Sequence, residues 1–215
     1  TEQSGLDNLR EEGKDLNNVF FVGNTMIDSL KAFSEEIQSK KFSFSYNEDR
    51  PYLAMTLHRP SNVDNKEGLF KILSLLQYCS EHFQIIFPMH PRTKKNIENF
   101  NFTKDFEAIE GVIFTDPLDY FTFQKLIAHS YCVITDSGGI QEETTFIGVP
   151  CVTLREDTER PVTIDIGTNE LMDFDPPKIL EKLNQLKEKN SQVPPLWDGY
   201  STNRIAEKLN EIFSI

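Results

Sequence analysis

Two adjacent glycines interrupt the apolar pattern of the chain in the stretch TDSGGIQEE, residues 135–143, which follows the apolar run YCVI. Gly138 and Gly139 would weaken the interior of a strand or helix, so they predict a tight turn with a helix starting directly after it. The first turn of a helix leaves backbone N–H groups without partners, and together with the aligned peptide dipoles these groups can bind an anion. The stretch therefore predicts an anion site.

Glu143 indicates which kind of anion that site would accept. It lies four residues after Gly139, and helical side chains tilt toward the N-terminus, so its carboxylate can lie beside the free N–H groups. A carboxylate repels an isolated phosphate but accepts hydrogen bonds well from the two hydroxyls of a ribose. Glu143 thus favours a nucleotide, whereas Glu142 is explained as a solvated acidic residue that the helix dipole stabilises.

Polar side chains follow several other predicted strands. They are His58, Arg59, His90, Arg92 and Asp116. Because the carboxyl ends of parallel strands meet at one edge of a sheet, we expect these loops to share a rim where ligands bind. Each residue also has a structural explanation, since a lone His is often a satisfied structural group and Arg59 could pair with a carboxylate. No third ligand accompanies the histidines, so a metal site is not expected.

Two aromatic residues allow two interpretations each. Phe123 belongs to a stripe with Leu126 and Ile127 that is typical of a helix core, although a base could stack on it at an exposed first turn. Trp197, in PPLWDGY, is explained more simply as a packing residue than as a ligand contact.

Short apolar runs alternate with helical patterns along the chain. Strands are expected at residues 18–23, 51–58, 84–90, 111–116, 131–136 and 150–155, and helices at 24–38, 64–79, 96–100, 120–130, 140–148, 178–189 and 203–213. Strands that are apolar on both faces and separated by helices predict the α/β class, with a doubly wound parallel sheet of Rossmann-like type.

Composition narrows the possible partners. The 215 residues contain 22 Lys and Arg against 34 Asp and Glu, a net charge of −12, so nucleic acid is not an expected partner. No apolar run has the length of a membrane span, and the first residues lack a signal peptide. Three scattered cysteines read as reduced core thiols, which favours the cytoplasm. The first residues resemble the middle of a helix, so we expect a piece of a longer protein.

With these features together, the chain resembles the C-terminal half of the non-hydrolysing UDP-N-acetylglucosamine 2-epimerases. The resemblance rests on the segments VGNTMIDSL, TLHRPSNVD, HPRT, TDP, TDSGGIQEE, GVPCVTLREDTERP, GTNEL and DGYSTNRIAE. It implies the C-terminal domain of a two-domain fold of the glycosyltransferase-B type. Residues 1–17 would then be a remnant helix from the preceding domain, residues 18–215 the UDP-binding domain, and the N-terminal catalytic domain would be absent.

The resemblance also implies roles for particular residues. Ser137, Gly138 and Gly139 would bind the diphosphate, Glu143 the ribose, Leu118 and Phe123 the uracil, and Arg160 would supply a cation near the phosphates. His58 corresponds to the family's catalytic-site histidine. Arg59 and His90 match positions that contact a second UDP-sugar, an activator, in some members. No cofactor or metal is implied, and we expect the full-length protein to be a homodimer.

The reaction that the resemblance implies is the interconversion of UDP-N-acetylglucosamine and UDP-N-acetylmannosamine by elimination and readdition of UDP. The family's acid and base carboxylates belong to the N-terminal domain, so the chain alone is expected to be inactive. Two alternatives are a UDP-sugar glycosyltransferase domain and a non-catalytic module that senses nucleotide sugars. The pairing of DSGGIQEE with TERP favours the epimerase over the glycosyltransferase.

Overall fold

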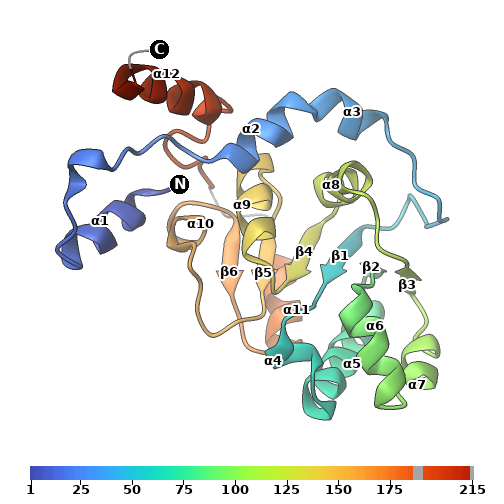
Figure 1. The fold of residues 1–215 in the computed structure, drawn as a ribbon. Coiled ribbons are helices and arrows are strands. Elements are labelled where there is room, and N and C mark those ends of the chain that lie inside the picture. The colour runs from blue at the N-terminus through green and yellow to red at the C-terminus, as the bar shows by residue number, and fades with distance from the viewer. Residues whose placement is uncertain (186–190, 214–215) are drawn as a thin grey trace.

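The computed structural model describes residues 1–185 and 191–213 and contains a six-stranded parallel sheet. Its strands are β1 (Tyr52–Thr56), β2 (Gln84–Pro88), β3 (Val112–Thr115), β4 (Cys132–Thr135), β5 (Cys151–Thr153) and β6 (Asn169–Leu171). The order across the sheet is β3-β2-β1-β4-β5-β6, so the chain winds outward in one direction from β1 and in the other from β4 (Figure 1). The predicted doubly wound parallel sheet is confirmed.

One group of helices packs on the first face of the sheet. These helices are α4 (Pro60–Val63), α5 (Lys66–Ser80), α6 (Pro91–Asn99), α7 (Thr103–Glu107) and α11 (Pro176–Gln185). The stripe of Leu69, Ile72, Leu73 and Leu76 predicted on α5 is buried against Leu53 and other strand residues in the largest core cluster. Burial of apolar area of this kind, at roughly 25 cal/mol per Å², is the main force that holds the layers together.

The opposite face is covered by a second group. It contains α8 (Tyr120–Ala128), α9 (Gly138–Ile147) and α10 (Pro161–Asp165), while α2 (Thr25–Ala32) and α3 (Ser34–Ser39) pack on α9 and α8. Leu126 and Ile127 of α8 and Ile140 of α9 pack there against Ala54 and Val133 of the sheet. The helix expected at residues 24–38 is divided into α2 and α3 at Phe33, whereas α4, α7 and α10 have no counterpart among the predicted helices.

The strand expected at residues 18–23 does not form. The 3₁₀ helix η1 (Leu16–Asn18) ends there, and the extended residues that follow lie outside the sheet. The carbonyl of Val22 accepts a hydrogen bond from Arg204 Nη1 at 3.1 Å, so this apolar run joins the C-terminal segment instead of a strand. The sixth strand is β6, in a segment where no strand or helix was predicted.

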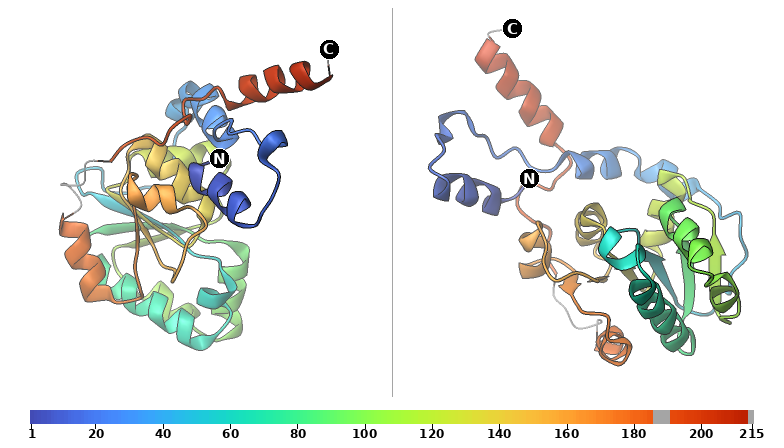
Figure 2. Two further views of the ribbon diagram at one scale, coloured as in Figure 1. Left: turned by 90° about the vertical axis from the view of Figure 1, so that its left-hand side faces the viewer. Right: turned by 60° about the horizontal axis from the view of Figure 1, so that its bottom comes forward.

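The terminal segments meet around Trp197. Its side chain is buried with Ile27, Leu30 and Ile37, and its Nε1 donates to the carbonyl of Thr1 at 2.9 Å, which confirms a packing role. Two further helices, α1 (Gln3–Glu11) and α12 (Ser201–Phe213), lie outside the sheet layers, and α12 projects away from the body (Figure 2). No helix in the described part of the chain is long and apolar enough to cross a membrane. Part of the helix expected at 178–189 lies outside the described residues.

Candidate functional site

The loops that follow β1 and β4 form the centre of the site. Thr56 and Thr135 are aligned partners at the carboxyl ends of these neighbouring strands, and the chain turns in opposite directions after them. This divergence leaves a crevice, which is where open α/β sheets bind ligands. His58 and Arg59 follow β1, and Asp136 follows β4, so the topology itself brings them together.

Asp136 connects the two loops. Its side chain is fully buried and lies 3.0 Å from His58 Nδ1, measured at Oδ1. The backbone N–H groups of His58 and Arg59 donate to the same carboxylate at 3.1 Å and 2.8 Å, and Asn62 Nδ2 donates at 3.0 Å. The main-chain carbonyl of Asp136 accepts from Arg59 Nε at 2.8 Å. Sequence reasoning had assigned no role to Asp136 or Asn62.

Asp136 is ionised despite its burial. Burial alone would raise the pKa of this carboxyl, but the hydrogen bonds from His58, Arg59 and Asn62 outweigh it and hold the pKa below its ordinary value. A buried carboxylate that accepts several hydrogen bonds from two loops holds those loops together.

His90 lies beside His58, as the shared rim predicted. Their ring centroids are 5.1 Å apart, and His90 Nδ1 accepts a hydrogen bond from the backbone N–H of Arg92 at 3.1 Å. Burial and the neighbouring charges of His58 and Arg92 lower the pKa of His90. The Arg92 side chain instead pairs with Asp64, with Nε at 2.7 Å from Oδ1. Asp116 pairs with Lys94 next to β3, away from this cluster.

The glycines form the first turn of α9, because the helix begins at Gly138 without a separate turn before it. The N-cap residue Ser137 makes no side-chain capping bond, so the first N–H groups of the helix are available. A Cβ added at Gly138 would lie 2.9 Å from Glu159 Oε1. Glu159 is paired with Arg59 Nη2 at 3.3 Å and Arg155 Nη1 at 2.7 Å. A carboxylate of the chain itself therefore lies next to Gly138, close to the predicted anion site.

Glu143 is buried between α9 and α8, with 5% of its surface exposed. Burial raises its pKa from the ordinary 4.5 to about 7, while a hydrogen bond from Gln124 opposes the rise and the charge of Glu142 adds to it. Leu118 and Phe123 are half-buried and pack against the same core cluster as Ile140, next to α9. The three residues assigned to ribose and uracil thus come from adjoining elements.

The interpretation of Glu142 as a solvated residue is wrong. Its side chain is buried, and Arg160 Nε lies 2.7 Å from its Oε1. Burial raises the pKa of Glu142, and the guanidinium of Arg160 counteracts that rise. The physical reason is tertiary, because Arg160 before α10 and Asn24 before α2 both lie against Glu142 on this side of α9.

A buried polar network holds the segment before α10. Gln141 Oε1 on α9 accepts from Thr158 Oγ1 at 2.6 Å and from Asn169 Nδ2 at 3.1 Å. Asn169 Oδ1 on β6 accepts from Thr153 Oγ1 at 2.6 Å. The bond to Thr158 fixes the residue that precedes Glu159 and Arg160, so the sequence motif TERP is joined to α9 and, through Asn169, to the sheet edge.

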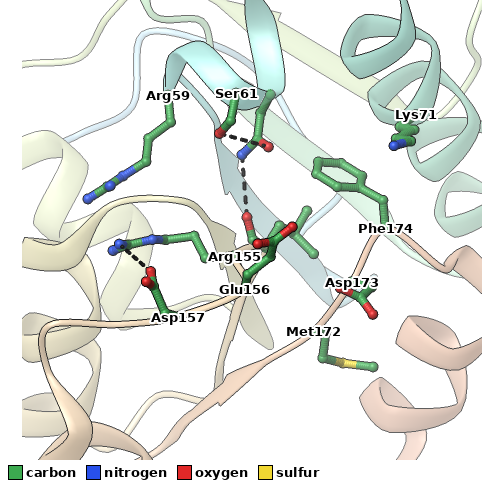
Figure 3. Close-up of a pocket in the computed structure, with 11 residues that line it drawn as sticks. Arg59, Ser61, Lys71, Arg155, Glu156, Asp157, Met172, Asp173 and Phe174 are labelled. Atoms are coloured by element: carbon green, nitrogen blue, oxygen red, sulfur yellow. Dashed lines mark hydrogen bonds and ion pairs between the residues drawn. The ribbon is translucent and has the colours of Figure 1, made fainter.

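A cavity of about 540 Å³ opens beside Arg59, a size typical of small-molecule sites. Figure 3 shows Arg59 and Arg155 on one side of this cavity and Lys71 and Phe174 on the other. Loops after β1, β5 and β6 line it, which places it at the same carboxyl edge as the crevice. Among residues 1–185 and 191–213, no group of three or more His, Cys, Asp or Glu could hold a metal ion.

Comparison with known proteins gives the same relatives at the level of sequence and structure. The family model for UDP-N-acetylglucosamine 2-epimerase matches residues 1–210. The Methanocaldococcus jannaschii UDP-N-acetylglucosamine 2-epimerase is 35% identical over 215 residues, covering 94% of this chain and 57% of the relative. Its crystal structure in complex with UDP-GlcNAc and UDP matches with a TM-score of 0.86 at 32% identity, over 98% of this chain and 59% of that one.

A second solved structure agrees. UDP-GlcNAc 2-epimerase from Neisseria meningitidis, bound to UDP-GlcNAc, matches with a TM-score of 0.80 at 26% identity, over 98% of this chain and 60% of that one. The present chain therefore spans a little more than half the length of these relatives, and both structures contain the same arrangement of strands and helices.

Proposed function

Because the chain belongs to the UDP-N-acetylglucosamine 2-epimerase family, we propose that it is the UDP-binding half of an enzyme that interconverts UDP-N-acetylglucosamine and UDP-N-acetylmannosamine. The observation that carries the proposal is the glycine start of α9 at the point where the strand order reverses, next to the His58–Asp136 pair. Relatives were crystallised with UDP and UDP-GlcNAc, which is the class of ligand that such a helix start suits.

In this proposal the diphosphate lies at Ser137, Gly138 and Gly139, where the first N–H groups of α9 are available. It would take the place now held by the Glu159 carboxylate, which leaves Arg59 and Arg155 free to face the phosphates. Such charge-assisted bonds are stronger than neutral ones.

The nucleoside extends from there toward α8. Glu143 accepts the ribose hydroxyls and the uracil lies against Leu118 and Phe123, an assignment supported by the adjoining positions of these three residues. Arg160 supplies positive charge beside the phosphates from the segment before α10.

The chemistry breaks the C1–O bond of the sugar, expels UDP and removes the C2 proton, which gives a bound glycal. Readdition of UDP and a proton on the other face of C2 yields the epimer. The leaving diphosphate needs stabilisation in the transition state, and the proposal assigns this role to His58, Arg59 and the start of α9. The base that removes the C2 proton is assigned to the other half of the enzyme.

Two further parts of the proposal concern ligands and assembly. Arg59 and His90 would contact a second UDP-sugar, an activator, which is supported by the position of both residues next to His58. The full-length enzyme is proposed to be a cytoplasmic homodimer.

Titration calorimetry of the chain with UDP tests the nucleotide site. Gly138→Val would place a branched side chain where phosphate must approach the backbone, so we expect the affinity for UDP to fall by about tenfold or more. Gly5→Val is the matched control, because nothing lies within 4 Å of that position on α1. Uridine should bind much more weakly than UDP. Unchanged UDP affinity in a folded Gly138→Val chain would place the nucleotide elsewhere.

A further inference from the structure

The buried carboxylate of Asp136 restricts which nitrogen of His58 can carry a proton. Three of its partners are obligate donors at this contact, namely the backbone N–H groups of His58 and Arg59 and the amide nitrogen of Asn62. An ionised carboxylate only accepts hydrogen bonds. The fourth partner, His58 Nδ1 at 3.0 Å, must therefore donate as well.

The other ring nitrogen of His58 has a different environment. Among the described residues, no side chain forms a hydrogen bond or an ion pair with Nε2 of His58. The His58 side chain is 36% exposed. Because Nδ1–H points at Asp136, only Nε2 is left to meet a ligand at the rim. Neutral His58 would present a lone pair there, and protonated His58 would present an N–H donor.

We propose that Asp136 is a positioning residue that fixes His58 in the Nδ1–H tautomer and makes Nε2 the atom that exchanges protons or hydrogen bonds with the ligand. The assignment of that ligand as a UDP-sugar rests on the proposed function. The same residue joins the loop after β1 to the start of α9, since its backbone continues into Ser137 and Gly138. Asp136 thus sets the position of the imidazole relative to the proposed diphosphate.

His90 offers an internal reference for this assignment. Its Nδ1 accepts a hydrogen bond from the backbone N–H of Arg92, so its neutral ring must carry the proton on Nε2. Two neighbouring histidines, with ring centroids 5.1 Å apart, are therefore expected to have opposite tautomers in the same molecule.

Long-range ¹H–¹⁵N NMR spectra of the ¹⁵N-labelled 215-residue chain, recorded without nucleotide at a pH where both rings are neutral, test the proposal. We expect a protonated Nδ1 and a bare Nε2 for His58 and the reverse for His90. The His58 signals are assigned by their loss in His58→Asn. A neutral His58 with its proton on Nε2 in the unmodified chain would overturn the proposal.

Asp136→Asn provides the second measurement. Its amide can offer only one acceptor oxygen and places an NH₂ group among donors, so His58 should shift toward the Nε2–H form while His90 keeps its tautomer. Asp116→Asn is the matched control, because it makes the same change at another strand end, where Lys94 is the partner. A folded Asp136→Asn chain that retains the Nδ1–H form contradicts the proposal, and if this variant does not fold, the spectrum of the unmodified chain decides.

The result of the NMR test of the His58 tautomer can be distinguished from the result of the UDP-binding test of the proposed function. Failure of UDP to bind in calorimetry would overturn the nucleotide site but leave the tautomer of His58 determined. The reverse result, UDP binding with His58 in the Nε2–H form, would retain the nucleotide site and remove the role of Asp136.

Discussion

Three glutamates near the start of α9 are stabilised in three different ways. Glu159 is exposed enough to meet water and is paired with two arginines, whereas Glu142 is buried against one. Glu143 has no cationic partner in its described contacts and is stabilised in its protonated form by burial. We therefore expect the substitution of Glu by Gln to have a different effect at each of these positions.

Glu159→Gln should raise the affinity of the chain for UDP. The Glu159 carboxylate lies where a phosphate would approach Gly138 and occupies the guanidinium groups that a phosphate would use. Because about half of this side chain is exposed, solvent screens its charge, and we expect a gain of only about three- to tenfold. Calorimetry with UDP measures it, and Glu156→Gln in the same loop is the control. Equal affinities for Glu159→Gln and the unmodified chain would show that this carboxylate does not compete with the ligand.

Glu143→Gln should change how stability depends on pH. In the unfolded chain Glu143 ionises near pH 4.5, but in the folded chain it keeps its proton until about pH 7. The folded state therefore loses stability relative to the unfolded state as pH rises through this window, by about 3 kcal/mol. The Gln side chain cannot ionise, so the stability of Glu143→Gln relative to the unmodified chain should increase by this amount.

Urea unfolding of both chains at about pH 4.5 and pH 7.5 measures that difference. Glu98→Gln on the exposed side of α6 controls for the general effect of removing a negative charge. If the free-energy difference between Glu143→Gln and the unmodified chain is the same at both pH values, Glu143 ionises normally in the folded protein. The same substitution should weaken UDP binding above pH 7, where Glu143 is ionised, because a carboxylate accepts the ribose hydroxyls more strongly than an amide does.

At the scale of elements, the strongest periodic signals gave correct predictions. Five of the six strands and the long helix α5 follow from apolar runs and from helical spacing of leucines. The run at residues 18–23 has the same composition but pairs with the C-terminal segment, a contact that depends on residues almost two hundred positions away. In β6, buried Asn169 serves the polar network with Gln141, so this strand lacks the apolar pattern that marks the others.

Gly23→Ala should destabilise the contact between the N-terminal and C-terminal segments. Gly23 has a φ of +95°, and an added Cβ would collide with the carbonyl of Leu196 and lie 2.6 Å from Ser201 Oγ. Backbone strain and overpacking together should cost at least about 2 kcal/mol. Gly5→Ala in α1 makes the same chemical change in open space and should be neutral or slightly stabilising. Thermal unfolding compares them, and an equal Tm for both variants would contradict the close approach.

At the scale of the whole molecule, the candidate site was only partly predictable. The rule that ligands bind at the carboxyl edge located His58, Arg59, His90 and the glycines of α9. It could not identify Asp136 as the joint between two loops or Glu159 as the carboxylate beside Gly138, because both roles depend on which side chains the fold brings within about 3 Å. The spacing of residues in the sequence predicts which face of a helix or strand is buried and where the element ends. Contacts between loops depend instead on how the whole sheet is assembled.

The final prediction concerns which part of the reaction this chain can carry out, since it spans a little more than half the length of its relatives. Removal of the weakly acidic C2 proton needs a positioned base. In the described site, Asp136 accepts hydrogen bonds from four donors, and Glu142 is paired with Arg160. Glu159 is paired with two arginines, and Glu143 is largely protonated below pH 7. We therefore expect the 215-residue chain to bind UDP without epimerising UDP-N-acetylglucosamine.

Incubation with UDP-N-acetylglucosamine in D₂O, followed by NMR of the sugar, tests this at the level of the individual proton. Abstraction by the chain would replace the C2 hydrogen with deuterium even if the product ratio did not change, so the absence of exchange is a stricter criterion than the absence of UDP-N-acetylmannosamine. UDP titration of the same preparation shows that the site is intact. Deuterium at C2 together with UDP binding would mean that a carboxylate of this half acts as the base, and Glu143, which ionises near pH 7, would then be the residue to replace first.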